Sequence, residues 1–381
     1  MLRFLARSIL MDKARTLLSV AAVAVALVLV LLLNGFETGM WQQIRTYRES
    51  LPVKLVALSA GTPGTVQTRS ALPADVVDAV SMVPGVSGVY PLVNVPTIFV
   101  RGEVKTPITV VGYERLGGPV RLREGRALAD TGEMVMDYAL ARRYGLTVGD
   151  RISLFGREFE LVGLSKGTTS LLGSYVFIDL QDAFSILSGS LPSNARTASP
   201  LTRRAAPNLL LIEAAPVAPP DMVRAAIEKA VPGVRVLTPA ELAESDVETV
   251  RGLMGSVLNL IIGVAYAVGV LVIGFTLYGA VFERLPEYGT MKALGAANGR
   301  LYVYVLGQAL IFTTVGFLLA IAGSLIVAIL VERSALQYSV VVWDGWVLLR
   351  SGVAGLLMAA LASLLPIRQV AGVDPAVVFR G

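Results

Sequence analysis

The chain contains no histidine and no cysteine, which removes two of the most versatile catalytic side chains. Without imidazole or thiolate there is no His or Cys ligand for zinc or haem, no thiol nucleophile and no disulfide. Carboxylates, lysines and serines remain, but their spacing forms no acid pair, no Ser–Lys pair and no metal-binding motif. The sequence also lacks G-x-x-x-x-G-K-S/T, the loop that binds the phosphates of ATP. We therefore expect a protein that is not an enzyme and that binds no cofactor itself.

One short segment has the pattern of a protein-binding element. Residues 283–300 read ERLPEYGTMKALGAANGR. Pro286 suits the first turn of a helix, and Gly295 suits its end. These two residues predict a helix of about two turns over residues 286–295.

The predicted helix carries an apolar face. Tyr288, Met291 and Leu294 recur every three residues, whereas Glu287 and Lys292 lie elsewhere around the helix. A helix this short has too little area to fold alone, so its apolar face needs a partner. The alternative is a connector at the membrane surface that only reverses the chain.

The elements that position this segment are long apolar stretches. Apolar residues make up 54% of the 381-residue chain and charged residues 16%, against roughly 45–50% and about 25% in soluble domains. A helix needs about 20 apolar residues to cross a bilayer, and four stretches qualify: residues 16–38, 253–282, 301–331 and 346–366. The first is longer than the roughly 7–15 apolar residues of a cleavable signal peptide, so we expect a retained anchor.

The basic residues that flank the spans predict their orientation. The amino-terminal arm (residues 1–15), the loop of residues 283–300 and the tail (residues 367–381) are each rich in Lys or Arg. The loop of residues 332–345 has a single basic residue. The positive-inside rule therefore places both termini in the cytoplasm and residues 39–250 outside. The arm is expected to form an amphipathic helix at the inner surface, or else a plain basic flank.

Arg350 is the one basic residue inside a predicted span. It lies near the outer end, close to Trp343 and Trp346, where a guanidinium can reach the lipid headgroups. The alternative is that Arg350 contacts a substrate.

Residues 39–250 are expected to fold as a mixed α/β domain. Alternating patterns predict strands at residues 53–58, 98–101, 108–111, 151–155, 158–162 and 208–212. Two similar strand–helix–strand halves carry the same Val-Pro-Gly-Val sequence, by common architecture or by chance. We therefore predict one part built from residues 50–95 and 207–238, with a small β-rich subdomain of residues 96–206 inserted between them.

A long helix is expected to connect this domain to the membrane. Thr238 is a suitable cap, and Glu241 lies in the first turn. No helix breaker lies between Glu241 and Gly252, so one helix should run from Pro239 to residue 282. Its first part, residues 239–252, would be a stalk outside the membrane. Residues 188–207, rich in Ser, Pro, Ala and Arg, are expected to form a loop.

Two motifs resemble one family. The run Glu287-Tyr-Gly-Thr-Met-Lys-Ala-Leu-Gly295, with Gln308 and Gly316 in the next span, resembles the FtsX/MacB-type (type VII) permeases of ABC transporters. The tail from Pro366, with its Asp-Pro-Ala, is similar to their common ending. The resemblance covers residues 240–381 well, the first 40 residues loosely and the outer domain by architecture only. The loop is also similar to the DevC-like branch, which works with a membrane-fusion adaptor.

The resemblance implies a homodimer of four-span subunits served by a separate cytoplasmic ATPase dimer, which would bind the ATP and Mg. The helix of residues 286–295 would be the coupling helix that docks on this ATPase, through Glu287, Tyr288, Met291, Lys292, Leu294 and Gly295. The part of the outer domain built from both ends would be porter-like. Motion would pass through the stalk without a transmembrane tunnel. The lack of buried charge in the spans agrees with that reading, since a polar route normally shows ionisable residues.

The prediction is therefore a permease subunit in the bacterial cytoplasmic (inner) membrane. It would couple ATP hydrolysis by its partner to motion of the extracytoplasmic domain, for export of an amphiphile, a lipid or another substrate. Membrane lipids and a periplasmic adaptor are further expected partners, whereas a net charge of +5 is too slight to imply nucleic acid. The alternatives are an FtsX-like regulator of an extracytoplasmic cell-wall hydrolase and a lipoprotein-release permease. An intramembrane enzyme finds no support in the sequence.

Overall fold

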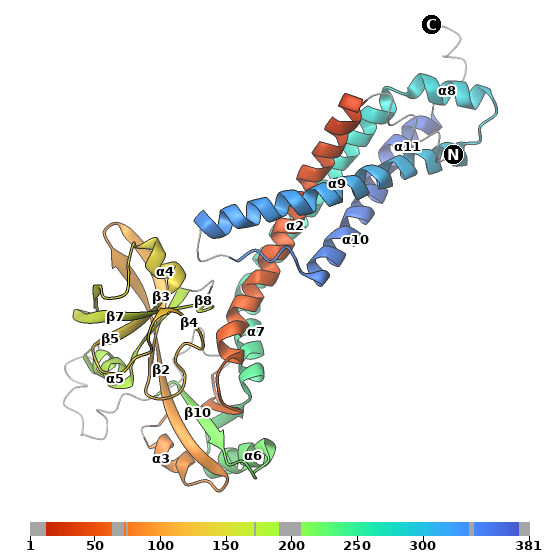
Figure 1. Ribbon diagram of the computed structural model, residues 1–381. Helices are drawn as coiled ribbons and strands as arrows, with labels where there is room; N and C mark the ends of the chain where they lie inside the picture. The colour runs from red at the N-terminus through yellow and green to blue at the C-terminus, as the bar shows by residue number, and fades with distance from the viewer. Residues whose placement is uncertain are drawn as a thin grey trace. The chain divides into compact units, whose positions relative to one another are not determined.

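The computed structural model in Figure 1 describes residues 13–62, 72–73, 75–170, 173–189, 207–334 and 339–372. The chain divides into two compact units. The span unit holds described residues 13–39, 256–334 and 339–372, and the α/β unit holds described residues from 40 to 255. Most of the predicted arm (residues 1–12), most of the loop of residues 188–207 and the end of the tail lie outside the described residues.

Four long helices carry the apolar stretches. They are α2 (Lys13–Glu49), α7 (Pro239–Phe282), α9 (Asn298–Ser334) and α10 (Gly345–Ala362). Each is long and apolar enough to cross a bilayer, which confirms the four predicted spans. Within the span unit they bury a shared core that includes Leu27, Ile273, Phe312 and Met358. Many of their other apolar side chains are exposed, as expected of helices that face lipid.

Helix α7 begins and ends where the sequence predicted. Its first turn is closed by a capping box, in which the Glu241 amide donates to Thr238 Oγ1 at 3.2 Å. The Thr238 amide in turn donates to the Glu241 carboxylate at 2.7 Å. The helix then continues to Phe282 without a break.

Two helix ends differ from the prediction. Helix α2 does not end near residue 38 but continues to Glu49, because residues 40–49 contain neither Gly nor Pro and have an apolar face to bury. The fourth span is not one helix to residue 366, because α10 ends at Ala362 and α11 (Leu364–Ala371) follows. Pro366 causes this break, since it has no N–H to donate to the Ala362 carbonyl.

The α/β unit is built on one extended sheet. Its strands are β1 (Leu55–Ser59), β2 (Val86–Arg101), β3 (Val104–Tyr113), β4 (Leu122–Gly125), β5 (Glu133–Asp137), β6 (Arg151–Leu154), β7 (Arg157–Ser165), β8 (Thr169–Ser170), β9 (Gly173–Asp179), β10 (Leu209–Ala214) and β11 (Val234–Leu237). In the part of the chain that is described, their order is β11-β1-β10-β2-β3-β9-β5-β7-β4, with β6 beside β7 and β8 beside β9.

Strand β2 joins two parts of this sheet. Its first half pairs antiparallel with β10, and its second half pairs antiparallel with β3. On the β10 side, α3 (Val76–Ser81) and α6 (Pro220–Ala230) pack on the sheet through a core that includes Val80, Leu210 and Ile227 (Figure 1). The units β1-α3-β2 and β10-α6-β11 are the two strand–helix–strand halves that the sequence indicated. On the β3 side, α4 (Tyr138–Arg143) and α5 (Leu180–Gly189) bury a second core.

Gly125 lies very close to the backbone of strand β7, and this contact gives a stability prediction. Gly125 has a φ of +74°, and a Cβ added there would lie 2.2 Å from the Val162 carbonyl oxygen. That oxygen accepts the Arg126 amide at 2.9 Å, so it cannot move without breaking the β4–β7 connection. Gly125→Ala is therefore expected to lower the unfolding free energy by more than about 2 kcal/mol in chemical denaturation.

Gly132→Ala is the matched control for this prediction. Gly132 has a similar φ of +80°, but nothing lies within 4 Å of the added Cβ. At Gly132 the substitution is therefore expected to lower the unfolding free energy by only about 1 kcal/mol, the cost of placing alanine at a positive φ. Equal losses for the two variants would mean that the contact at Gly125 is not tight.

Candidate functional site

A short helix, α8 (Leu285–Ala293), connects α7 to α9 in the span unit. Pro286 lies in its first turn, and Leu294 is its carboxy-terminal cap. Gly295 then takes a φ of +86°, a conformation that glycine adopts at no steric cost. The sequence therefore placed this helix correctly to within a residue or two at each end.

Tyr288 fastens α8 to the rest of the span unit. It is 1% exposed and lies in a core with residues of α7, α9 and α11: Val281, Leu301, Tyr304, Val305 and Val370. Its ring meets that of Tyr304 edge-on, with 5.9 Å between the centroids. Burial raises the pKa of the Tyr288 hydroxyl, and within the described structure its oxygen has no hydrogen-bond partner.

The prediction that Tyr288, Met291 and Leu294 share one face is wrong for Leu294. Tyr288 is buried and Met291 is half-buried against the same core, whereas Leu294 is 88% exposed. An α-helix turns by about 100° per residue, so each three-residue step drifts by about 60°. Tyr288 and Leu294 therefore point about 120° apart, and a spacing of three alone does not keep them on one face.

Lys292 also holds α8 from within. Its Nζ donates to the main-chain carbonyl of Ala371 at 2.8 Å, at the last residue of α11. A lysine satisfies an unpaired carbonyl at a helix end in this way. We expected Lys292 at the docking surface. Its ammonium group instead binds α11 of the same chain.

The exposed side of α8, which we call the α8 surface, is small and mixed in character. It comprises Pro286, Glu287, Thr290, Ala293 and Leu294. Thr290 was not among the residues selected from the sequence, although it falls between Glu287 and Leu294 in the helical repeat. An acidic, a hydroxyl and a leucine side chain on a short rigid helix suit contact with a protein. Among the described residues, no group of three or more acidic side chains could hold a metal ion.

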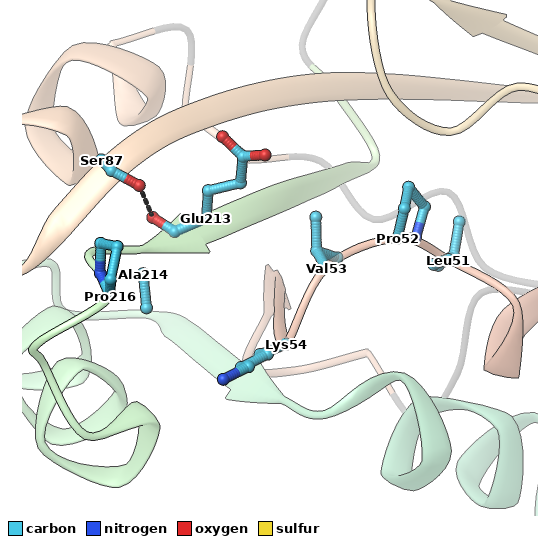
Figure 2. Close-up of a pocket in the computed structure, with 8 residues that line it drawn as sticks. All are labelled: Leu51, Pro52, Val53, Lys54, Ser87, Glu213, Ala214 and Pro216. Atoms are coloured by element: carbon cyan, nitrogen blue, oxygen red, sulfur yellow. Dashed lines mark hydrogen bonds between the residues drawn. The ribbon is translucent and has the colours of Figure 1, made fainter.

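An open cavity of about 500 Å³ lies in the α/β unit and is shown in Figure 2. It is lined by Leu51, Pro52, Val53, Lys54, Ser87, Glu213, Ala214 and Pro216. The Glu213 carboxylate accepts the Tyr90 hydroxyl at 3.0 Å, and the Ser87 hydroxyl donates to the Glu213 carbonyl at 3.0 Å. The Ser87 hydroxyl thus donates to a main-chain carbonyl rather than to a side-chain base.

Two family models match the chain. The MacB-like periplasmic core domain matches residues 16–230, which is more than half of the chain, and the FtsX-like permease C-terminal domain matches residues 259–375. An uncharacterized ABC transporter permease of Mycobacterium tuberculosis is 23% identical over 371 residues, covering 97% of this chain and 96% of that protein. The macrolide export ATP-binding/permease protein MacB of Nitrosomonas europaea is 21% identical over 388 residues, covering 96% of this chain and 56% of that protein.

Two solved structures are also similar to part of the chain. The extracellular domain of the noncanonic ABC-type transporter YknZ from Gram-positive bacteria gives a TM-score of 0.35 at 13% identity, over 49% of this chain and 98% of that one. The periplasmic region of MacB from Actinobacillus actinomycetemcomitans gives a TM-score of 0.35 at 10% identity, over 51% of this chain and 92% of that one. With the two family models covering the α/β unit and the spans, the chain belongs to the MacB- and FtsX-type family of ABC transporter permeases.

Proposed function

We propose that this chain is a permease subunit that receives force from a separate cytoplasmic ATPase at the α8 surface and transmits it to the α/β unit outside. The observation that carries the proposal is the attachment of α8. Tyr288 and Lys292 fix the helix to α9 and α11, while Glu287, Thr290 and Leu294 remain exposed. A helix held on one side and open on the other transmits a push on its open side to the helices beneath it.

A two-helix stalk in the α/β unit supports the transmission of force. The sequence predicted a stalk of one helix over residues 239–252, but the end of α2 packs beside the start of α7 there (Figure 1). Ile44 packs against Val247 and Val250. Because α2 and α7 are each continuous with a span, a push on either span reaches the stalk.

Polar contacts reinforce this pairing of helices. Arg45 of α2 forms an ion pair with Glu244 of α7. The Arg251 guanidinium of α7 lies 5.2 Å from the ring centroid of Trp41 of α2, within range of a cation–π interaction. Two helices bound by apolar and ionic contacts bend less than a single helix does.

A buried ion pair joins the two stalk helices, and the residue beside it contacts the sheet. The Arg48 guanidinium donates to Asp246 at 3.1 Å, with the two side chains 2% and 0% exposed. Tyr47, next to Arg48, packs on Tyr175 of β9 with 4.6 Å between the centroids. The Tyr47 hydroxyl also donates to the Gly117 carbonyl at 2.5 Å. Motion of the stalk would therefore move the sheet.

We assign the ATP chemistry to a separate partner chain. The partner ATPase binds the ATP and Mg, and two copies of this chain form the working homodimer. We infer that the motion serves export of an amphiphile, a lipid or another substrate, with a periplasmic adaptor as a further partner. The relative named for macrolide export carries both ATP-binding and permease parts in its name, and this chain spans 56% of it.

The proposed orientation is tested by labelling single cysteines. The chain has no cysteine, so each introduced thiol is unique. Val217 in the α/β unit is 95% exposed, and Asn298, which follows α8, is also exposed. A membrane-impermeant maleimide added to intact spheroplasts is expected to label Val217→Cys and to leave Asn298→Cys unlabelled until the cells are lysed. The reverse pattern would place the α/β unit in the cytoplasm.

The docking assignment is tested by a charge on the α8 surface. Leu294→Asp is expected to weaken binding of the partner ATPase by about tenfold or more, about 1.4 kcal/mol, since docking would bury an unpaired carboxylate. Binding is measured by titrating the ATPase against the purified permease and following the stimulation of ATP hydrolysis. Val217→Asp is the control, because it places the same charge on an exposed apolar position of the α/β unit. Unchanged stimulation in Leu294→Asp would remove α8 from the interface.

A further inference from the structure

A polar cluster lies inside the span unit, where α2, α7 and α10 meet. Its members are Asn34 and Glu37 of α2, Tyr266 of α7, and Arg350 and Ser351 of α10. The Arg350 guanidinium donates both to the Asn34 side-chain oxygen and to the Glu37 carboxylate. The Asn34 amide donates to Ser351 Oγ at 2.9 Å and to the Tyr266 hydroxyl at 3.1 Å.

This cluster corrects two expectations from the sequence. Arg350 was expected to reach the headgroups or, alternatively, to contact a substrate, and the spans were expected to lack buried charge. Instead Arg350 pairs with Glu37, and their side chains are 32% and 17% exposed, so the charged pair is partly buried, whereas Asn34 and Ser351 are fully buried. An ionisable pair within membrane spans is costly and marks function by default.

The cluster is suited to connecting helices rather than to binding a ligand. The charges of Arg350 and Glu37 cancel, and both polar atoms of the Asn34 side chain are already bonded within the cluster. Asn34 and Glu37, both on α2, accept from the same nitrogen of Arg350, Nη2, so the guanidinium connects α10 to α2.

The backbone makes a second connection between α2 and the start of α10. The Val341 amide donates to the Gly35 carbonyl at 3.1 Å. A Cβ at Gly39 would lie 2.2 Å from the Ser339 carbonyl oxygen, so only glycine allows this approach. The segment before α10 is therefore pressed against α2 beside the cluster.

The opposite end of the fourth span touches α8. Helix α11, which follows α10 after Ser363, accepts Lys292 at its last carbonyl and contributes Val370 to the core around Tyr288. The pair α10–α11 thus contacts α8 at one end and α2 at the other.

We propose that Arg350 is a positioning residue that makes the fourth span a second route for force, from α8 through α11 and α10 to α2. This proposal rests on the proposed function. In the first route α8 pushes α7, to which it is joined directly along the chain. In the second route α10 moves α2, because Arg350 binds Glu37 and Asn34. Both stalk helices are then displaced together.

The experiment measures ATP-driven displacement in the permease–ATPase complex. Spin labels at cysteines replacing Val217 in the α/β unit and Val315 in α9 report the distance between the two units; both residues are exposed, and neither belongs to the cluster. Arg350→Met is expected to reduce the ATP-dependent change in this distance at least fivefold while the affinity for the ATPase stays unchanged. Arg350→Lys still reaches a carboxylate and is expected to keep at least half of the change.

The double variant Glu37→Gln/Arg350→Met separates positioning from folding. It leaves no uncompensated charge, so it is expected to melt at the wild-type temperature and still to lose the distance change at least fivefold. A full distance change in the double variant, or Arg350→Lys behaving like Arg350→Met, would overturn the proposal. If the wild-type complex itself shows no ATP-dependent change, the proposed function fails instead.

Discussion

Asp246→Asn is expected to lower the unfolding free energy of the α/β unit by about 3–5 kcal/mol. The variant keeps the size of the side chain but removes its charge, and Arg48 then remains charged in a place where it is 2% exposed. Arg48 also touches the rings of Tyr47 and Tyr175, so its guanidinium cannot turn toward water without disrupting them. Chemical denaturation of the purified protein, followed by circular dichroism, measures the loss.

Glu244→Gln provides the control on the same pair of helices. Glu244 pairs with Arg45, but these side chains are 45% and 39% exposed. An exposed ion pair contributes only about 0–1 kcal/mol because water screens both charges. If both variants lowered the unfolding free energy by the same small amount, Arg48 and Asp246 would not form a buried ion pair that stabilises the unit.

Tyr288→Ala is expected to release α8 from the span unit. The substitution deletes a buried aromatic ring, which typically costs about 3–5 kcal/mol. Because the ring joins α8 to α9 and α11, the loss should be local to α8. Hydrogen exchange should rise in residues 285–293, and the partner ATPase should lose most of its stimulation, while the melting of the α/β unit stays unchanged.

Tyr288→Phe should behave in the opposite way. The variant keeps the ring and removes a buried hydroxyl that has no partner in the described structure. Removing an unsatisfied buried polar group is neutral or stabilises by up to about 1–3 kcal/mol. If Tyr288→Phe were as damaging as Tyr288→Ala, the hydroxyl would have a partner in the working complex.

The membrane spans could be predicted because their signal is local. A run of apolar residues with no charge specifies a span by its length alone, and α7 was placed correctly at both ends by a cap and a loss of apolar pattern. Strands with one exposed face, such as β6 and β7, were found by their alternation. Strand β9 was missed, because six of its seven residues are buried and a central strand shows no alternation.

The site was predicted only in part, because its contacts connect distant segments. The two-turn helix could be located from Pro286 and Gly295, but its inward face depends on Tyr304 and Val370, which lie elsewhere in the chain. Arg350 and Glu37 are 313 residues apart, and nothing in either local sequence indicates the other. Tertiary packing decides which side of a short helix is free.

The most direct test of the central claim is a crosslink from the α8 surface. A photoreactive maleimide is attached to Leu294→Cys, in a chain with no other cysteine. It is expected to crosslink the permease to its ATPase in the purified complex. The amount of crosslinked product is expected to depend on the nucleotide present. The same probe on Val217→Cys should give no such product. An ATPase that crosslinks to another part of the chain but not to Leu294, or an active complex purified without any ATPase, would contradict the account.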